Sequence, residues 1–331
     1  MKADKRVLHA LRSKQSREGQ WKRKMVKHGV VRWKENFEIA KETADSSKWE
    51  KVKKNIKDLL FTQRSAFWKN YIHPLIVQGN FLKLIESESS DLTWRSVIYD
   101  LPKGVLSFAV RSAIDFLPTF NNLRTWGKRS NVACKLCTNK ETLQHILNIC
   151  PTALNQGRFT WRHNSILSTI LAQLHDIISK SATTGIKIYA DLSGWTIGGG
   201  TIPPNVLTTS QRPDLVIVDE TKKRILVMEL TIPFEMNIKD AHNRKMERYG
   251  CLVADLRSAG YKVELSCVEI GSRGLITNDN KTRIKTIFKF VGSKARQSFF
   301  RDVAKNVLLC SYALWNCRHE PLWVECPYIK V

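Results

Sequence analysis

The chain has 331 residues, 43% of them hydrophobic, which is enough for one large domain or several small ones and argues against wholesale disorder. Its 54 Lys and Arg against 30 Asp and Glu give a net charge of +24, which indicates a polyanionic partner, either nucleic acid or an anionic membrane surface. No apolar run reaches the roughly 18–20 residues of a spanning helix, and the N-terminus has no apolar signal-peptide core, so we expect a nuclear or otherwise intracellular protein that is not secreted.

Residues 1–60 are strongly basic, with 18 Lys or Arg against 8 Asp or Glu, and their composition is compatible with helix. They are either a solvated helical extension or a basic arm that lies along phosphates, and the two interpretations are compatible. Residues 61–130 predict a helical linker domain, because apolar side chains recur at helical spacing between prolines and glycines.

The segment 131–180 carries the most specific motif, C-x2-C-x7-H-x4-C, followed by a helix. Its four candidate ligands are Cys134, Cys137, His145 and Cys150. Three thiolates and one imidazole can close a tetrahedron around Zn²⁺, with sulfur–zinc bonds of about 2.3 Å, and four protein ligands are typical of a structural site. The motif therefore predicts one bound zinc ion, with His145 on a short helix over 141–150.

The remaining cysteines have no such spacing. In a reducing compartment they are expected to be core thiols and not disulfides. Cys317 and Cys326, with the nearby His319, form an alternative second metal site.

A basic and aromatic cluster directly follows the zinc-binding motif from Cys134 to Cys150, which we call the knuckle. Arg158, Arg162 and His163 are candidate nucleic-acid contacts, because guanidinium groups bind phosphate. Phe159 and Trp161 alternate with them and are candidates for stacking on unpaired bases. The alternative is that both aromatic rings pack beneath the knuckle and that His163 caps the next helix.

From residue 186 the hydrophobic period changes to that of strands. The predicted elements are strands at 186–191, 212–219, 224–231 and 261–270, and a helix at 238–259 before the last strand. This order predicts a mixed sheet over 186–290 with a helix across one face. The last segment, 291–331, is predicted as a C-terminal helix, about 293–316, and a tail.

The predicted sheet carries candidate catalytic residues. Asp214 opens one strand after a proline, and Glu229 lies inside the next strand, so both carboxylates can reach one Mg²⁺ or Mn²⁺. A metal-dependent nuclease also needs a cation that steadies the developing charge. We expect Lys245 to supply it from the following helix, with Tyr249 four residues later on the same helix face.

Other assignments remain open at this stage. The position two residues after the acid, where restriction enzymes place their lysine, is Thr231, and Lys239 is an alternative to Lys245. Asp191 and Glu235 are secondary candidates for metal contact or support.

These residues resemble a known family, the C-terminal part of non-LTR retrotransposon polyproteins that carry a restriction-like endonuclease and insert into ribosomal RNA genes. The resemblance covers roughly residues 90–290. It rests on five features: the knuckle spacing, Thr142–Leu147, Arg158 with Arg162-His163-Asn164, Arg212-Pro213-Asp214 with Glu229, and Lys245 with Tyr249. It implies a multi-domain α+β or α/β fold, with a helical N-terminal region, a CCHC zinc knuckle and a PD-(D/E)XK restriction-endonuclease-like mixed sheet flanked by helices.

The resemblance also implies an activity: the intact element nicks one DNA strand and primes reverse transcription from the freed 3′ hydroxyl. The chain lacks the Tyr/Phe-x-Asp-Asp polymerase motif, so we expect it to be the C-terminal portion of such an element, able to bind DNA and RNA and to nick DNA. The competing hypothesis is an inactive nucleic-acid-binding remnant or a domesticated zinc-knuckle protein. A structural zinc protein with no nucleic-acid partner fits the charge poorly.

Overall fold

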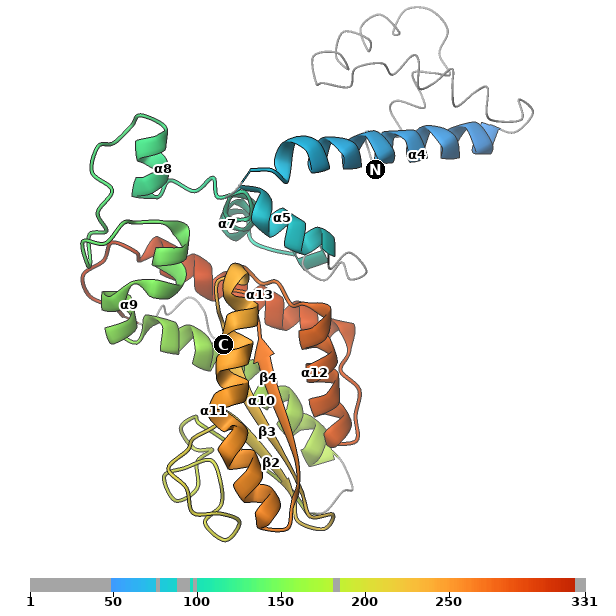
Figure 1. Ribbon diagram of the computed structural model, residues 1–331, viewed down its shortest axis with the longest axis vertical. Helices are drawn as coiled ribbons and strands as arrows, with labels where there is room; N and C mark the ends of the chain where they lie inside the picture. Colours follow the sequence, from blue (N-terminus) through green and yellow to red (C-terminus); the bar gives the residue numbers. More distant parts are fainter. Residues whose placement is uncertain (1–48, 76–77, 88–95, 98–99, 181–184, 325–331) are drawn as a thin grey trace, which may run out of the picture. The chain divides into compact units, whose positions relative to one another are not determined.

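The computed structural model describes residues 49–75, 78–87, 96–97, 100–180 and 185–324. The chain divides into two compact units, Met1–Ile76 and Val77–Val331. In the first unit, helix α4 (Trp49–Phe67) continues into the π-helical turn η1 (Trp68–Ile72) (Figure 1). Residue 60, the expected boundary, falls inside α4, and the first proline of the chain is Pro74, which follows η1. Most of the predicted basic extension lies outside the described residues.

The second unit is built on a four-stranded mixed sheet in the order β1-β2-β3-β4. Its strands are β1 (Ile186–Ala190), β2 (Leu215–Asp219), β3 (Arg224–Thr231) and β4 (Lys262–Glu269). The pairs β1–β2 and β2–β3 are antiparallel, whereas β3 and β4 are parallel and joined through helix α11 (Ile238–Ser258). The element order predicted from the hydrophobic period is confirmed.

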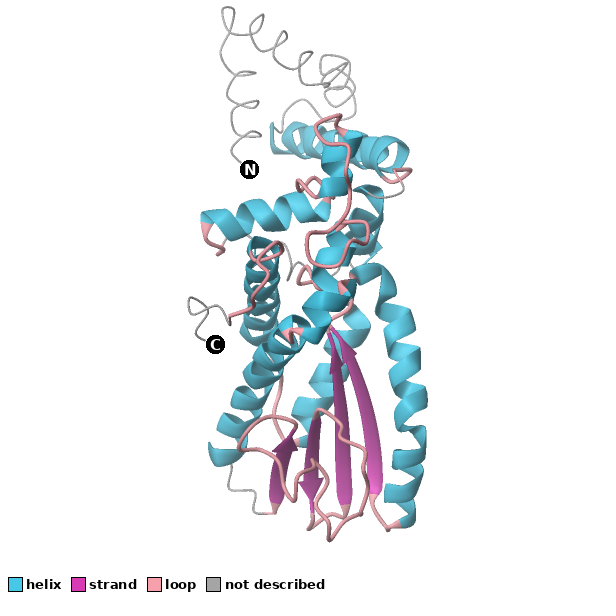
Figure 2. Cartoon of the chain, turned by 90° about the vertical axis from the view of Figure 1, so that its left-hand side faces the viewer, coloured by secondary structure: helices cyan, strands magenta, loops and turns pink. Residues whose placement is uncertain are grey.

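Helices cover both faces of this sheet (Figures 1 and 2). On one face, side chains of β2 and β3 pack with helices α10 (Arg158–Lys180), α12 (Asn278–Phe290) and α13 (Gln297–Asn316). On the other face a smaller core forms under α11. The predicted tail helix is thus α13, and it shares its core with the sheet.

Strand alternation decides which face each acid occupies. Val227 packs in the core under α11, and Glu229, two residues later on β3, lies on the same face. Asp214 comes directly before β2 and therefore lies at the end of that strand, next to Glu229 of β3. Glu229 faces the helix that carries the candidate lysine.

The knuckle and several short helices complete the second unit. They are α5 (Gln78–Ser87), α7 (Lys103–Ala113), α8 (Phe120–Thr125), η2 (His145–Ile149), α9 (Pro151–Asn155) and η3 (Glu235–Asn237). Phe108 of α7, Leu147 of η2 and Leu314 of α13 belong to one buried cluster. The knuckle is therefore packed on the C-terminal helix that also supports the sheet.

Candidate metal centre and carboxylate site

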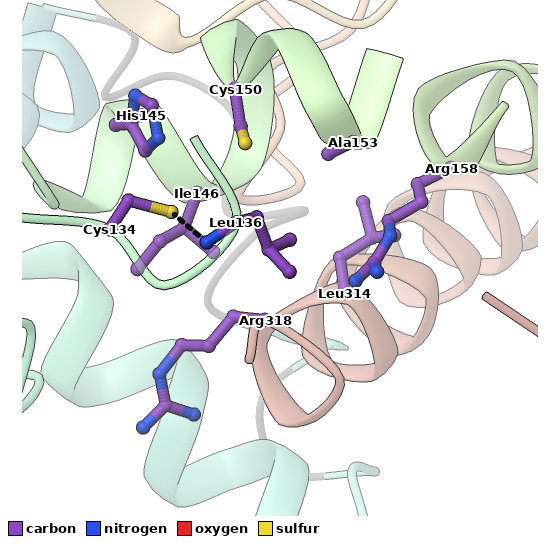
Figure 3. A pocket seen from close by; sticks show the side chains of 9 residues that line it. All are labelled: Cys134, Leu136, His145, Ile146, Cys150, Ala153, Arg158, Leu314 and Arg318. Atoms are coloured by element: carbon purple, nitrogen blue, oxygen red, sulfur yellow. Dashed lines mark hydrogen bonds between the residues drawn. The ribbon is translucent and has the colours of Figure 1, made fainter. Parts of the chain in front are cut away.

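The four predicted zinc ligands converge, and every pair of their ligand atoms lies within 4.8 Å. Cys134 and Cys137 lie in the turn closed by the bridge between Ala133 and Lys140. Instead of the expected longer helix, His145 begins the π-helical turn η2, and Cys150 directly precedes α9. Figure 3 shows three of these ligands, Cys134, His145 and Cys150, around one small pocket.

The spacing of these atoms fits a tetrahedral metal. The Sγ atom of Cys137 lies 3.2 Å from Nε2 of His145 and 3.6 Å from Sγ of Cys150, and zinc bonds of about 2.3 Å would hold two sulfurs roughly 3.8 Å apart. The Leu136 N–H also points at Sγ of Cys134, at 3.4 Å. Burial raises the pKa of Cys150 to about 12, a cost that a bound cation removes by holding the thiolate. The cluster can therefore bind a metal such as zinc.

His319, a member of the alternative second metal site, has two partners in the described part of the chain. Its Nε2 lies 2.8 Å from the buried Glu141 carboxylate, and its ring stacks on Phe120 at 4.7 Å. The Cys317 carbonyl accepts a hydrogen bond from Arg158. Cys326, the third member of that hypothesis, lies outside the described residues.

Asp214 and Glu229 come together across β2 and β3 through their own backbones. The Asp214 N–H donates to Oε2 of Glu229 at 3.2 Å, and the Leu230 N–H donates to Oδ2 of Asp214 at 2.7 Å. These reciprocal bonds hold both carboxylates at the end of the hairpin strands. The Asp214 side chain keeps 13% exposure and Glu229 keeps 4%, so a ligand meets Asp214 first.

Helix α11 supplies the positively charged side chain of the site, Lys245. Nζ of Lys245 forms a direct ion pair with Oε1 of Glu229. Tyr249, one helical turn later, is buried, and its hydroxyl donates to the Arg212 carbonyl at 3.3 Å. The structure thus places Lys245 and Tyr249 on the α11 face that meets the acids, and Lys239, the alternative lysine, lies near the start of α11.

His163 joins the same site from α10. Its Nε2 lies 3.2 Å from Oδ2 of Asp214 and 3.2 Å from the Leu230 carbonyl oxygen, and its Nδ1 lies 3.0 Å from the Asn164 side chain. The prediction that His163 contacts nucleic acid directly finds no support in this geometry. The imidazole instead extends the acid–lysine cluster to a third element of the fold.

The pKa values in the site reflect burial and close charges. Burial, together with the nearby Asp214 charge, raises the pKa of Glu229 against the opposing effect of Lys245. Burial alone would lower the pKa of His163, but the hydrogen bond to Asp214 and the charge of that carboxylate outweigh it and raise the value to about 9. The pKa of Tyr249 is raised by burial and by the Glu229 charge, so its hydroxyl stays protonated. At neutral pH the site holds protonated His163 beside Asp214.

Arg158 and Arg162 are used differently from what the sequence predicts. Both are buried, at 2% and 1% exposure. Arg158 donates to the carbonyls of Cys317 and Glu320 at 2.6 Å each, and Arg162 donates to the Ile232 carbonyl at 3.2 Å. The prediction of direct phosphate contact finds no support in this arrangement, because both side chains are buried.

The two aromatic residues between these arginines are also packed. Phe159 and Trp161 contact the buried cluster that joins the knuckle to α13, and Trp161 meets Trp323 edge-on at 5.3 Å. This is the packing alternative that the sequence left open. The basic and aromatic residues therefore lie in the interior, where they connect the knuckle to the C-terminal helix and to the end of β3.

The two secondary candidate acids, Glu235 and Asp191, form ion pairs with arginines. Glu235 is buried and paired with the equally buried Arg273 at 2.7 Å, so it supports the fold and not a metal. Asp191 forms an ion pair with Arg212. Its backbone N–H donates to the Asp214 carbonyl at 2.9 Å, so it borders the site.

One charged network was missed by sequence reasoning. Glu269, at the end of β4, is fully buried and pairs with His242 at 3.1 Å and with Arg283 at 3.0 Å. It links α11 and α12 to the sheet. An acid at the end of an apolar strand was the signal that singled out Glu229, and the same signal marks Glu269.

Comparison with known proteins gives no assignment. No protein-family model matches the chain, and no curated protein matches it significantly in sequence. The chain is thus characterised by its own features: a mixed α+β fold, a Cys₃His cluster, and a buried cluster of acids, lysine, tyrosine and histidine.

Proposed function

We propose that this protein is a Mg²⁺- or Mn²⁺-dependent DNA endonuclease that nicks one strand and carries a structural zinc ion. The observation that carries the proposal is the Lys245–Glu229 ion pair beside Asp214, because three residues from three elements meet at one point. Two carboxylates suit a hard divalent cation, since Mg²⁺ takes one or two protein carboxylates and fills its other positions with water and phosphate oxygens.

Each residue has a role in this proposal. A bound Mg²⁺ would activate a water and polarise the scissile phosphate. Asp214, the more exposed acid, offers Oδ1, which accepts no hydrogen bond from the described residues. Lys245 is the charge that stabilises the developing oxyanion. Tyr249 fixes the Arg212 backbone, and His163 holds the Asp214 carboxylate in place.

The knuckle has a structural role in this proposal. All four of its ligands come from the protein, as in structural zinc sites. It is packed against α13, and Arg158 ties the start of α10 to the residues that follow α13. Zinc would thereby fix the start of the helix that delivers His163 to Asp214.

The sequence resemblance gives the biological setting of the proposal. Within a non-LTR retrotransposon, a nick made in nuclear DNA would free the 3′ hydroxyl that primes reverse transcription. The net charge of +24 supports DNA and RNA as partners.

A plasmid-nicking assay tests the activity. Wild type should convert supercoiled DNA to the open circle with Mg²⁺ or Mn²⁺ and not with Ca²⁺ alone, and Asp214→Asn should abolish nicking while DNA affinity stays within about twofold, because affinity rests on the basic surface. EDTA is a poor control because it also removes zinc. Equal nicking by wild type and Asp214→Asn would refute this site.

A second candidate function is nucleic-acid binding without cleavage. It is favoured by the fact that both oxygens of Glu229 are already used, one by Lys245 and one by the Asp214 N–H. A metal bound to Glu229 would share these oxygens with Lys245 and the Asp214 N–H. Metal-independent DNA binding together with no nicking under any divalent cation would favour this alternative.

A further inference from the structure

Helix α8 lies far from the strands in Figure 1, and basic and aromatic residues lie on both sides of it in the sequence. The rings of Phe116 and Trp126 stand 4.9 Å apart at an interplanar angle of 46°. Phe116 is 54% exposed, which is unusual for a phenylalanine in a folded domain, and Trp126 is half-buried beside it. We call this the Phe116–Trp126 surface.

The backbone around Phe116 is built to present the ring. After α7 ends, Asp115 takes a left-handed conformation with φ of 46°, which only a few per cent of non-glycine residues adopt. The Asn122 side chain then donates to the carbonyls of Asp115 and Leu117, at 2.8 and 2.9 Å. Thr119 caps α8 by accepting from the Asn122 N–H at 3.1 Å. Phe116 is thus held outward by a hydrogen-bonded turn.

The charged residues near the two rings in the sequence are almost all positive. Arg111, Arg124 and Lys128 are exposed, lie within five residues of one ring or the other, and pair with no acid in the described part of the chain. The one acid in this stretch is the half-buried Asp115, whose pKa is raised by burial. The surface therefore offers two ring faces to a partner that carries negative charge.

We propose that the Phe116–Trp126 surface binds single-stranded nucleic acid, with unpaired bases stacked on the two rings and phosphates held by Arg111, Arg124 and Lys128. Unpaired bases expose flat faces that stack on aromatic side chains, and the phosphates between them match the surrounding cations. A duplex hides its base faces, and an acidic peptide would use the charges but not the rings. The assignment goes beyond the carboxylate site and needs no cleavage.

The test measures anisotropy of labelled oligo(U) and oligo(dT) of about 12 nucleotides, within the roughly 4–16 nucleotides such platforms cover, and of a duplex, all without Mg²⁺. Replacing both rings (Phe116→Ala, Trp126→Ala) should weaken single-strand binding about thirtyfold or more, as expected when two bases no longer stack, and leave duplex binding within twofold. The aromatic variant Phe116→Tyr, Trp126→Phe should retain binding, which separates stacking from folding. The RNA and DNA arms show which strand is preferred.

A charge pair provides the matched control. Arg124→Ala with Lys128→Ala should reduce the salt slope for single strands by about 1.4, from roughly 0.7 for each phosphate contact. Lys285→Ala with Lys289→Ala removes the same charge from α12 and should leave the slope unchanged. The proposal is overturned if the double alanine ring variant, with unchanged zinc content and circular dichroism, binds single strands as wild type does. It is also overturned if both charge pairs lower the slope equally.

Discussion

At the residue scale, two buried glutamates on neighbouring strands, Glu229 and Glu269, differ in the basic side chains that pair with them. Glu269 is paired with Arg283 and His242 from two helices, an arrangement that ties α11 and α12 to the sheet. Glu229 faces a single flexible lysine and a second carboxylate. The three basic side chains are similarly exposed, so the two acids differ in the number of partners: Glu269 has two and Glu229 has one. The proposed function therefore assigns the metal to Glu229 and not to Glu269.

The first prediction concerns that lysine. Lys245→Ala should lower the initial nicking rate by about 10²–10³, the usual cost of removing one electrostatic stabiliser of a transition state, and leave DNA affinity nearly unchanged. Arg257→Ala, at an exposed position further along α11, is the control and should nick normally. A rate within threefold of wild type would remove Lys245 from the mechanism.

The second prediction concerns the His163–Asp214 pair, whose histidine pKa is raised to about 9. A raised folded-state pKa means that the pair adds stability fully below the unfolded value of about 6.5 and loses it as pH rises through the folded value. His163→Gln should therefore be less stable than wild type by on the order of 1–3 kcal/mol near pH 6, and the gap should close above about pH 9.

Urea unfolding at both pH values, without Mg²⁺, measures this gap. Comparing wild type with the variant at each pH cancels the pH dependence of the knuckle, which the two proteins share. Asn164→Ala is a useful partner, because it removes the Nδ1 contact and leaves Asp214 in place. A gap that is constant with pH would mean that folding leaves the pKa of His163 unchanged.

At the element scale, the first two turns of α10 join three parts of the second unit. Arg158 reaches the residues after α13, Arg162 reaches the carbonyl of Ile232 just beyond β3, and His163 reaches Asp214. The start of one helix thus connects knuckle, sheet and C-terminal helix. The positive charges there serve that connection, which explains why they are absent from the surface.

The third prediction follows from this connection. Burial lowers the pKa of Arg162 to about 10, so it stays charged at neutral pH and its hydrogen bonds are charge-assisted. Arg162→Met should destabilise the protein by about 2–4 kcal/mol, because the Ser311 hydroxyl and the Ile232 carbonyl lose their donor. The salt slope of DNA binding should not change. A shallower slope in a variant of normal stability would restore the phosphate-contact role.

The fourth prediction concerns the knuckle. Purified protein should contain about one zinc per chain, and Cys137→Ser should lose it. Cys251→Ser, which changes an exposed cysteine outside the cluster, should keep it. Because Leu147 of the knuckle packs with α7 and α13, zinc loss should also lower the unfolding temperature. Unchanged zinc in Cys137→Ser would show that the four residues do not form the site.

Sequence patterns predicted the sheet well, because β2 and β3 are short apolar runs bounded by turn residues and α11 has a helical period. They also brought Asp214, Glu229 and Lys245 together in advance, since alternation and helix spacing assign faces. The same patterns did not predict that Arg158 and Arg162 are buried. Arg158 is buried because carbonyls more than 150 residues away accept its hydrogen bonds, and no local pattern encodes that.

At the scale of the whole molecule, charge is distributed unevenly between the two units. Residues 1–76 hold 20 Lys and Arg against 8 Asp and Glu, so they carry half of the net charge of +24 in under a quarter of the chain. The second unit contains the zinc cluster, the carboxylate site and the cores that support them. We therefore expect residues 1–76 to contribute much of the affinity for DNA, and the second unit to carry the proposed cleavage site.

The last prediction separates these two contributions. A shortened chain of residues 77–331 should unfold cooperatively and bind about one zinc, because its cores lie within the second unit. Its affinity for duplex DNA should fall at low salt, with a salt slope lower by about 0.9 for each phosphate that residues 1–76 neutralise in the full chain. At saturating protein its nicking rate should stay within a few-fold of the full chain, since Asp214, Glu229 and Lys245 are all retained. An unchanged salt slope would instead identify residues 1–76 as a solvated extension that does not touch the phosphates.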